Sequence, residues 1–211
     1  MLILIAGGGS ANPLAENIPI MSSEHSNFTN VSYKFDTIFT GIPRAISAVF
    51  GPSDYKIGWF VIVAVFISSP IMAFQAVFGA LLSILTCIVL EIPQGVIESG
   101  LWGYTSVLSC IATGGFFYYL TPQTYFISLI NAIVTCFTHA TLSIWLKQDS
   151  GQLPLGAFPF VLTTFVFLSF NSKSVWIKRV ELKEVTYPED NLMRWMLEKE
   201  NGNEQELEAT V

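Results

Sequence analysis

The chain has 211 residues, of which 52% are hydrophobic and 12% are charged, and its formal net charge is −6 at pH 7. The charged share is about half of that in a typical soluble domain. Between residues 57 and 172 only Glu91, Glu98, Lys147 and Asp149 carry a formal charge. An apolar stretch of this length can be buried only in lipid, which excludes a soluble globular fold and predicts an all-α integral membrane protein.

The chain begins with a segment, residues 1–38, that contains glycosylation sequons at Asn27 and Asn30. If these sequons are used, the segment is extracellular or lumenal. Its first apolar run is too short and too uncharged for a secretion signal. We therefore expect an extracellular segment at the N-terminal end.

Six apolar segments follow, at residues 39–50, 57–74, 75–91, 100–120, 123–146 and 155–170. The first has about 12 residues, whereas a helix needs roughly 20 to cross a bilayer. The last follows Pro154 and contains Pro159, so its first turns are expected to break from the rest. Short or proline-interrupted segments at membrane depth line cavities in transporters, which predicts a permeation path.

Basic residues fix the orientation of the last segment. They gather just after it, at Lys173, Lys178, Arg179 and Lys183, and predict a cytoplasmic C-terminus. An extracellular start and a cytoplasmic end need an odd number of crossings. We therefore predict five transmembrane helices plus one re-entrant or half-membrane helix in residues 39–172, followed by an acidic, partly disordered tail, residues 173–211.

Other chemistries have weaker support in the sequence. His25, His139, Ser106 and Ser109 have no nucleophile elbow or base at a defined spacing, so an enzyme is not expected. Cys87, Cys110 and Cys136 lie in apolar runs, as small core residues do, and no metal site is predicted. Glu91 and Glu98 flank Pro93, either as solvated loop carboxylates or as members of a proton relay.

Whole stretches of the sequence resemble the urea transporters of animals. The motifs that carry the resemblance are PRAISAVFG at 43–51, FISSP at 66–70, GLWGY at 100–104, LSCIATGG at 108–115, TPQT at 121–124, LP at 153–154 and VTYPE at 185–189. Their order and spacing match across about 150 residues, and they are similar to the second of the two homologous halves of that family. The start of the chain then resembles the closing turns of the helix that precedes the glycosylated loop.

The resemblance implies one half of an inverted-repeat transporter, with trimers of protomers in the plasma membrane. A narrow slot with apolar and aromatic walls would pass urea while oxygen acceptors replace its water hydrogen bonds. The residues that match slot positions are Ala48, Tyr104, Leu108, Leu153, Ala157 and Phe158. The resemblance implies no cofactor, metal or nucleic acid, and the expected partners are the lipid bilayer and a small neutral solute.

Two slot positions depart from the family pattern. Ala48 stands where the family usually has a glutamine, and Ala157 stands where it has a threonine at the central constriction. Neither alanine offers a side-chain acceptor. The sequence therefore leaves two interpretations open: passive, channel-like transport of urea or a similar solute by one repeat or a truncated product, or a non-conducting membrane subunit with a degraded slot.

Overall fold

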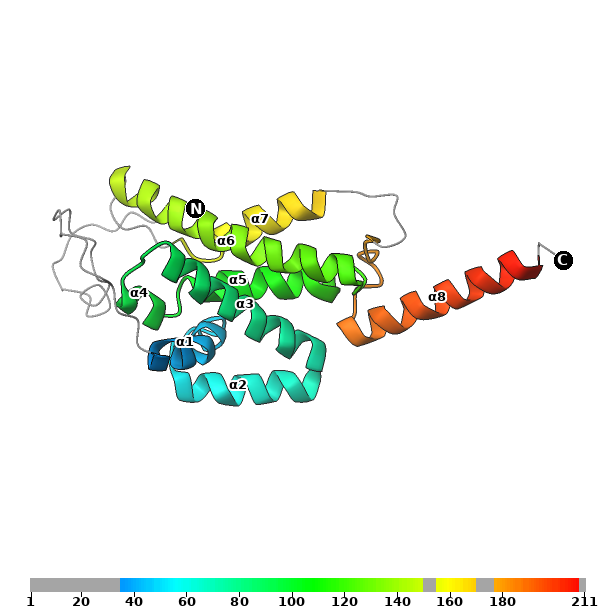
Figure 1. Ribbon diagram of the computed structural model, residues 1–211, viewed down its shortest axis with the longest axis horizontal. Helices are drawn as coiled ribbons and strands as arrows, with labels where there is room; N and C mark the ends of the chain where they lie inside the picture. The colour runs from blue at the N-terminus through cyan, green and yellow to red at the C-terminus, as the bar shows by residue number, and fades with distance from the viewer. Residues whose placement is uncertain (1–34, 150–154, 170–176, 209–211) are drawn as a thin grey trace, which may run out of the picture. The chain divides into compact units, whose positions relative to one another are not determined.

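Helices account for all regular structure in the part of the chain that the computed structural model describes, residues 35–149, 155–169 and 177–208. They are α1 (Phe35–Ala48), α2 (Tyr55–Ser68), α3 (Pro70–Val89), α4 (Gln94–Glu98), α5 (Gly103–Ile111), the π-helix η1 (Ala112–Phe116), α6 (Pro122–Asp149), α7 (Phe158–Ser169) and α8 (Pro188–Glu208), and Figure 1 shows their order. The predicted all-α class is confirmed for this part. Both sequons lie outside the described residues.

The apolar run of residues 57–91 breaks at Ser69, not at Gln75 as the sequence predicted. Ser69 is extended, with φ −154°, and its Oγ accepts a hydrogen bond from Met72 N at 3.2 Å. Pro70 follows as the first residue of α3, where its missing N–H needs no partner and its fixed φ suits a helix. The serine cap and the proline together explain why α2 ends and α3 begins at this point.

The predicted segment 100–120 also consists of two elements, α5 and η1. Two adjacent glycines disrupt the helical backbone in η1, and Gly115 has φ +124°, a conformation that side-chain-bearing residues rarely adopt. A Cβ at Gly114 would overlap the side chain of Gln75, whose Nε2 donates to Gly114 O at 3.1 Å. Close packing against α3 thus fixes the place where the helix ends.

Two described helices are long and apolar enough to cross a bilayer. They are α3, with 20 residues, and the Pro122–Leu146 part of α6, with 25 residues. Helices α2 and α7 are apolar but shorter. The five crossings and the re-entrant helix therefore stay a prediction.

The side chains are distributed as expected for a protein in lipid. Phe60 and Ile67 of α2 are both 79% exposed, whereas Thr105 and Ser109 of α5 are fully buried. A protein in water would place these residue types the other way round. The outward apolar surface and the buried polar groups agree with a membrane environment.

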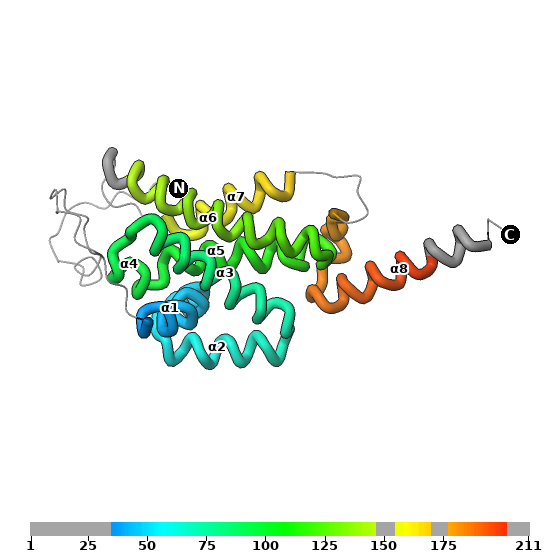
Figure 2. Tube along the Cα trace, in the orientation of Figure 1, coloured from blue at the N-terminus to red at the C-terminus, as the bar shows by residue number. Residues whose placement is uncertain are grey.

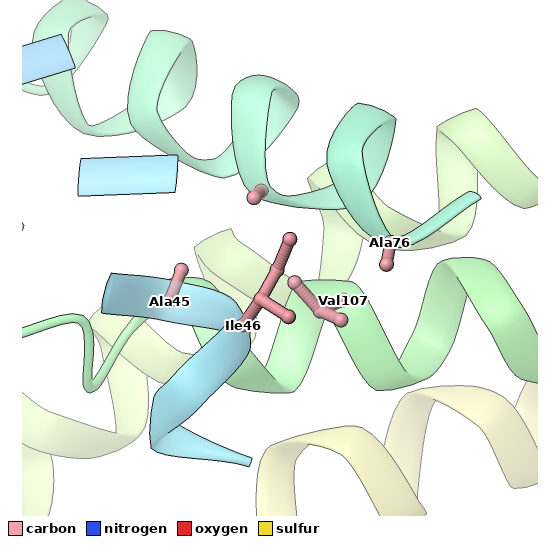
Figure 3. Packing of buried hydrophobic residues seen from close by; sticks show 5 residues of the cluster. Ala45, Ile46, Ala76 and Val107 are labelled. Carbon is pink, nitrogen blue, oxygen red and sulfur yellow. The ribbon is translucent and has the colours of Figure 1, made fainter. Parts of the chain in front are cut away.

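Small side chains let α1, α3 and α5 pack closely. The buried cluster between them consists of Ala45, Ile46, Ala76, Ala80 and Val107, and Figure 3 shows Ile46 and Val107 in contact between the helices. A Cβ at Gly79 would lie 2.9 Å from Ser106 O, so α3 and α5 approach backbone to backbone. Membrane helices use such close approach in place of a hydrophobic driving force. The tube in Figure 2 shows α3, α5 and α6 side by side.

The VTYPE motif connects the tail to the membrane helices. The Glu189 carboxylate accepts hydrogen bonds from Ser69 Oγ at 2.8 Å and from Ile71 N at 3.0 Å, at the start of α3. Asn191 Nδ2 donates to Gly115 O at 3.1 Å. Composition predicts partial disorder in this acidic tail, whereas the structure has the helix α8, which begins at these anchoring contacts.

Candidate functional site

The centre of the candidate site is α5, and small residues before and at its start bring it against α1. Gly100 has φ +69°, and a Cβ there would lie 2.8 Å from Arg44 O. A Cβ at Gly103 would overlap the Cβ of Ala45. Only glycine fits at these two positions, which explains the spacing of the GLWGY motif.

Tyr104 and Leu108 lie on one face of α5, because residues four apart are neighbours on a helix. Both are half-buried, whereas the residues between them are buried. On one side of this face lies Val107, which packs against α1, and on the other lies Ser109, which faces Thr164 of α7 at 3.5 Å. The Tyr104–Leu108 face is therefore flanked by α1 and α7.

The other predicted slot residues of the described chain lie at the ends of those flanking helices. Ala48 is the last residue of α1 and is half-buried. Ala157 immediately precedes α7 and is exposed, and Phe158 is 54% exposed. We call Ala48, Tyr104, Leu108, Ala157 and Phe158 the candidate slot face. The remaining predicted slot residue, Leu153, lies outside the described residues.

Helix α7 begins with its polar groups turned inward. Pro159 is in the first turn, where a proline removes no helical hydrogen bond, and it is buried. Thr163 and Thr164 are also buried, and Thr163 Oγ1 lies 2.7 Å from Thr135 Oγ1 of α6. The opposite side of α7 is exposed and apolar, including Val161 and Phe165. These contacts fix α7 to α5 and α6 while Ala157 and Phe158 stay uncovered.

A row of polar pairs joins the other side of α5, and η1 after it, to α6. Thr105 Oγ1 lies 3.2 Å from His139 Nδ1, Thr135 Oγ1 donates to Ser109 Oγ at 2.7 Å, and Asn131 Nδ2 donates to Thr113 Oγ1 at 3.4 Å. Successive pairs lie four residues apart along each of the two antiparallel helical segments, so the row follows one face of each. We call these six residues the polar seam.

The polar seam was not predicted, although the sequence contains a signal for it. Thr105, Ser109 and Thr113 recur every four residues within an apolar run, as do Asn131, Thr135 and His139 in another. All six are buried, and Asn131 Oδ1 is the one buried side-chain oxygen of the described part that has no hydrogen-bond partner. Buried polar groups in lipid are costly unless they pair, so recurrence at this spacing predicts a helix–helix contact.

The described residues considered as nucleophiles or bases also make contacts between helices. Ser109 accepts the hydrogen bond from Thr135, and Ser106 Oγ donates to Ala132 O at 2.9 Å. His139 pairs with Thr105 and packs against the Trp102 ring, with 5.5 Å between ring centroids. Each group therefore has a packing partner between helices. His25 lies outside the described residues.

Neither of the two acidic candidates belongs to the candidate slot face. Glu98 Oε1 accepts from Gln94 Nε2 at 2.7 Å, and Glu98 Oε2 lies 3.9 Å from Arg44 Nη1. Its side chain is 40% exposed. Glu91 follows α3 with φ +53°. Among the described residues no three His, Cys, Asp or Glu side chains are placed to hold a metal ion.

The described site is thus an uncharged, partly open surface backed by a buried polar seam. Comparison with known proteins identifies the family of the chain, because the family model described as urea transporter matches residues 1–172. The chain belongs to the urea transporter family. This membership confirms the resemblance found in the sequence and makes the chain a membrane protein.

Three mammalian relatives show how much of a urea transporter the chain covers. It is 34% identical to urea transporter 1 of sheep (Ovis aries) over 154 residues, which are 73% of this chain and 40% of the relative. It is 32% identical to urea transporter 1 of rat (Rattus norvegicus) over 77% of this chain and 42% of the relative, and 32% identical to that of mouse (Mus musculus) over 81% and 44%. The chain spans about two fifths of the length of these urea transporters.

Proposed function

We propose that the chain forms one wall of a passive, channel-like path for urea or a similar small neutral solute. The observation that carries the proposal is the candidate slot face, where Tyr104 and Leu108 lie partly open between α1 and α7 with no charged side chain among its five members. A flat apolar and aromatic wall favours a planar neutral solute and excludes hydrated ions. The family membership and the names of the relatives support urea as that solute.

A second wall is needed to complete such a path. In inverted-repeat transporters the substrate site lies at the interface of two repeats. We propose that an N-terminal repeat provides the second wall and that the complete protein forms trimers in the plasma membrane. In this proposal, residues 1–38 are extracellular, 39–172 form the membrane domain and 173–211 are the cytoplasmic tail.

Reconstitution of the chain with the N-terminal repeat of a mammalian relative tests this function. Stopped-flow shrinkage and swelling should show urea permeability above that of empty vesicles, unchanged by sodium or proton gradients, because a passive path needs no coupling ion. Sodium chloride permeability should equal that of empty vesicles. Flux that depends on an ion gradient would contradict a channel-like mechanism.

The topology has a separate test in the two sequons. Expression in a glycosylating cell should give a product whose apparent mass falls after glycosidase treatment and no longer does so after Asn27→Gln and Asn30→Gln together. A protease added outside intact cells should leave an epitope at the C-terminus untouched. An unglycosylated, inserted product with an externally accessible tail would reverse the orientation.

The two alanines favour a second candidate, a non-conducting urea-transporter-like subunit. Ala48 and Ala157 cannot donate or accept a hydrogen bond through their side chains, so a solute at these points would lose contacts that a glutamine and a threonine could supply. This candidate keeps the fold and the packing surfaces but not the selectivity. This candidate is favoured if the reconstituted pair shows no urea flux, both with the two alanines and after their substitution by glutamine and threonine.

A further inference from the structure

Two cysteines of different helices meet inside the membrane domain, and neither belongs to the candidate slot face. Cys87 of α3 and Cys136 of α6 have their Sγ atoms 3.8 Å apart. Both residues are almost fully buried, at 1% and 0% exposure. Both are free thiols, so the pair is a preformed dithiol between the two described helices that are long enough to span a bilayer.

The surroundings of this dithiol are apolar and uncharged. Ile84 and Ile97 are the other buried members of the hydrophobic cluster that contains both cysteines. The partly buried Trp102 packs against this cluster. The polar neighbour is Ser83, whose Oγ lies 3.5 Å from Cys136 Sγ and whose carbonyl oxygen lies 3.7 Å from it. A net charge in such a site is costly, so a ligand that fits must leave the complex neutral.

We propose that Cys87 and Cys136 form a binding site for monosubstituted trivalent arsenicals, the class represented by methylarsonous acid. In the reaction two As–O bonds break and two As–S bonds form. The two thiol protons leave with the two hydroxides as water. Arsenic stays trivalent, so no oxidant is required, and reagent, dithiol and product are all neutral.

Charge and geometry favour this ligand over the metal ions that thiols also bind. A monovalent soft cation bound by two thiolates would leave a negative charge in the apolar cluster. A linear two-coordinate ion would also hold its two sulfur atoms farther apart than a pyramidal arsenic atom does. Because α3 and α6 already hold the thiols together, the second As–S bond forms within one molecule and gains from a high effective concentration.

The third cysteine provides a matched control within the same chain. Cys110 is also fully buried, but its Sγ donates a hydrogen bond to Gln75 Oε1 at 3.0 Å. Its second hydrogen-bond partner is Ser128 Oγ, at 3.9 Å. It therefore offers one thiol where a stable arsenic adduct needs two. Substitution of Cys110 should leave arsenic binding unchanged.

The test uses the full chain, purified in detergent and incubated with methylarsonous acid. Intact-mass measurement should show one methylarsenic group less two hydrogens per chain. The adduct should survive an excess of a monothiol and be removed by a dithiol. Cys87→Ser and Cys136→Ser should each weaken binding by at least about tenfold, since a single As–S bond loses the effective-concentration gain. Cys110→Ser should bind like the parent.

A second readout distinguishes this site from unspecific thiol modification. Bridging α3 and α6 should raise the melting temperature of the parent and of Cys110→Ser, because the ligand binds the folded state, and leave that of Cys87→Ser and Cys136→Ser unchanged. The proposal is wrong if the folded parent forms no adduct, if either serine variant of the pair binds like the parent, or if Cys110→Ser removes the adduct.

Discussion

The polar seam and the candidate slot face use different sides of the same short helix, α5, and they differ in how much of their surface this chain covers. In the seam, Ser109 and Thr113 find partners on α6 within the chain. On the slot face, Tyr104 and Leu108 stay half-buried, and Phe158 of α7 is 54% exposed. The comparison indicates that the seam holds α5 and α6 together, and the open slot face supports our proposal that a second repeat completes it.

The largest expected effect concerns the packing that places α5 against α1. Gly103→Val should abolish stable folding or lower stability by about 3 kcal/mol, because even a Cβ at Gly103 overlaps Ala45 and neither backbone can give way. Unfolding in increasing sodium dodecyl sulfate, followed by circular dichroism, measures the loss.

Ala64→Leu is the control for that substitution. It adds the same number of carbon atoms on the exposed surface of α2, where lipid can accommodate them. Its stability should match that of the parent. Equal behaviour of the two variants would show that the close α1–α5 contact does not determine the position of the slot face.

The next effect concerns conduction by the complete slot, with the N-terminal repeat present. A solute that misses one hydrogen bond at an apolar constriction is less stable there by about 1–3 kcal/mol, which corresponds to roughly 5- to 150-fold in rate if that point limits passage. Ala157→Thr should therefore raise urea flux clearly, and Ala48→Gln, nearer the mouth, should raise it less. Stopped-flow permeability of both single variants and the double variant measures this order.

Surface expression and assembly of these variants must match the parent for the comparison to count. A larger gain from Ala48→Gln than from Ala157→Thr would place the limiting point at the mouth. Unchanged flux in all three variants would favour the non-conducting subunit.

A smaller effect is expected for the seam itself. Thr135 Oγ1 donates to Ser109 Oγ at 2.7 Å and lies 2.7 Å from Thr163 Oγ1, so Thr135→Val removes two contacts between helices. Hydrogen bonds between membrane helices contribute about 0.6 kcal/mol each on average and up to about 1.7 kcal/mol. We expect a loss of about 1 kcal/mol in the same detergent unfolding experiment.

Thr138→Val is the control on the same helix. The Thr138 hydroxyl donates to Val134 O of its own helix at 2.8 Å and makes no described contact with another helix. This variant should stay within a few tenths of a kcal/mol of the parent. A loss as large as that of Thr135→Val would mean that the seam adds nothing beyond local helix propensity.

Much of the fold can be predicted from the sequence because lipid imposes simple rules. The apolar run after residue 57 predicts membrane helices, and α6 follows the predicted segment closely, since length and apolarity define it. The break between α2 and α3 was predicted at Gln75 instead of Ser69, because the apolar run continues through Ser69 and only the cap and Pro70 mark the break. The helix α8 could not be predicted, because its anchors lie on α3 and η1, far away in the sequence.

The candidate site, like the fold, could be predicted only in part. Tyr104 and Leu108 could be placed on one face from their spacing alone. That this face is flanked by α1 and α7 depends on Val107 and Ser109 contacting different helices, which no spacing reveals. The roles of Ala48 and Ala157 still rest on the family resemblance.

The central claim is that the slot face of this chain conducts only when a second repeat completes it. The most direct measurement is urea permeability, by stopped-flow light scattering, of vesicles that contain these 211 residues alone, beside vesicles that also contain an N-terminal repeat. The account predicts that the chain alone matches empty vesicles and that the pair conducts urea faster. Rapid, saturable urea flux through the chain alone would contradict it.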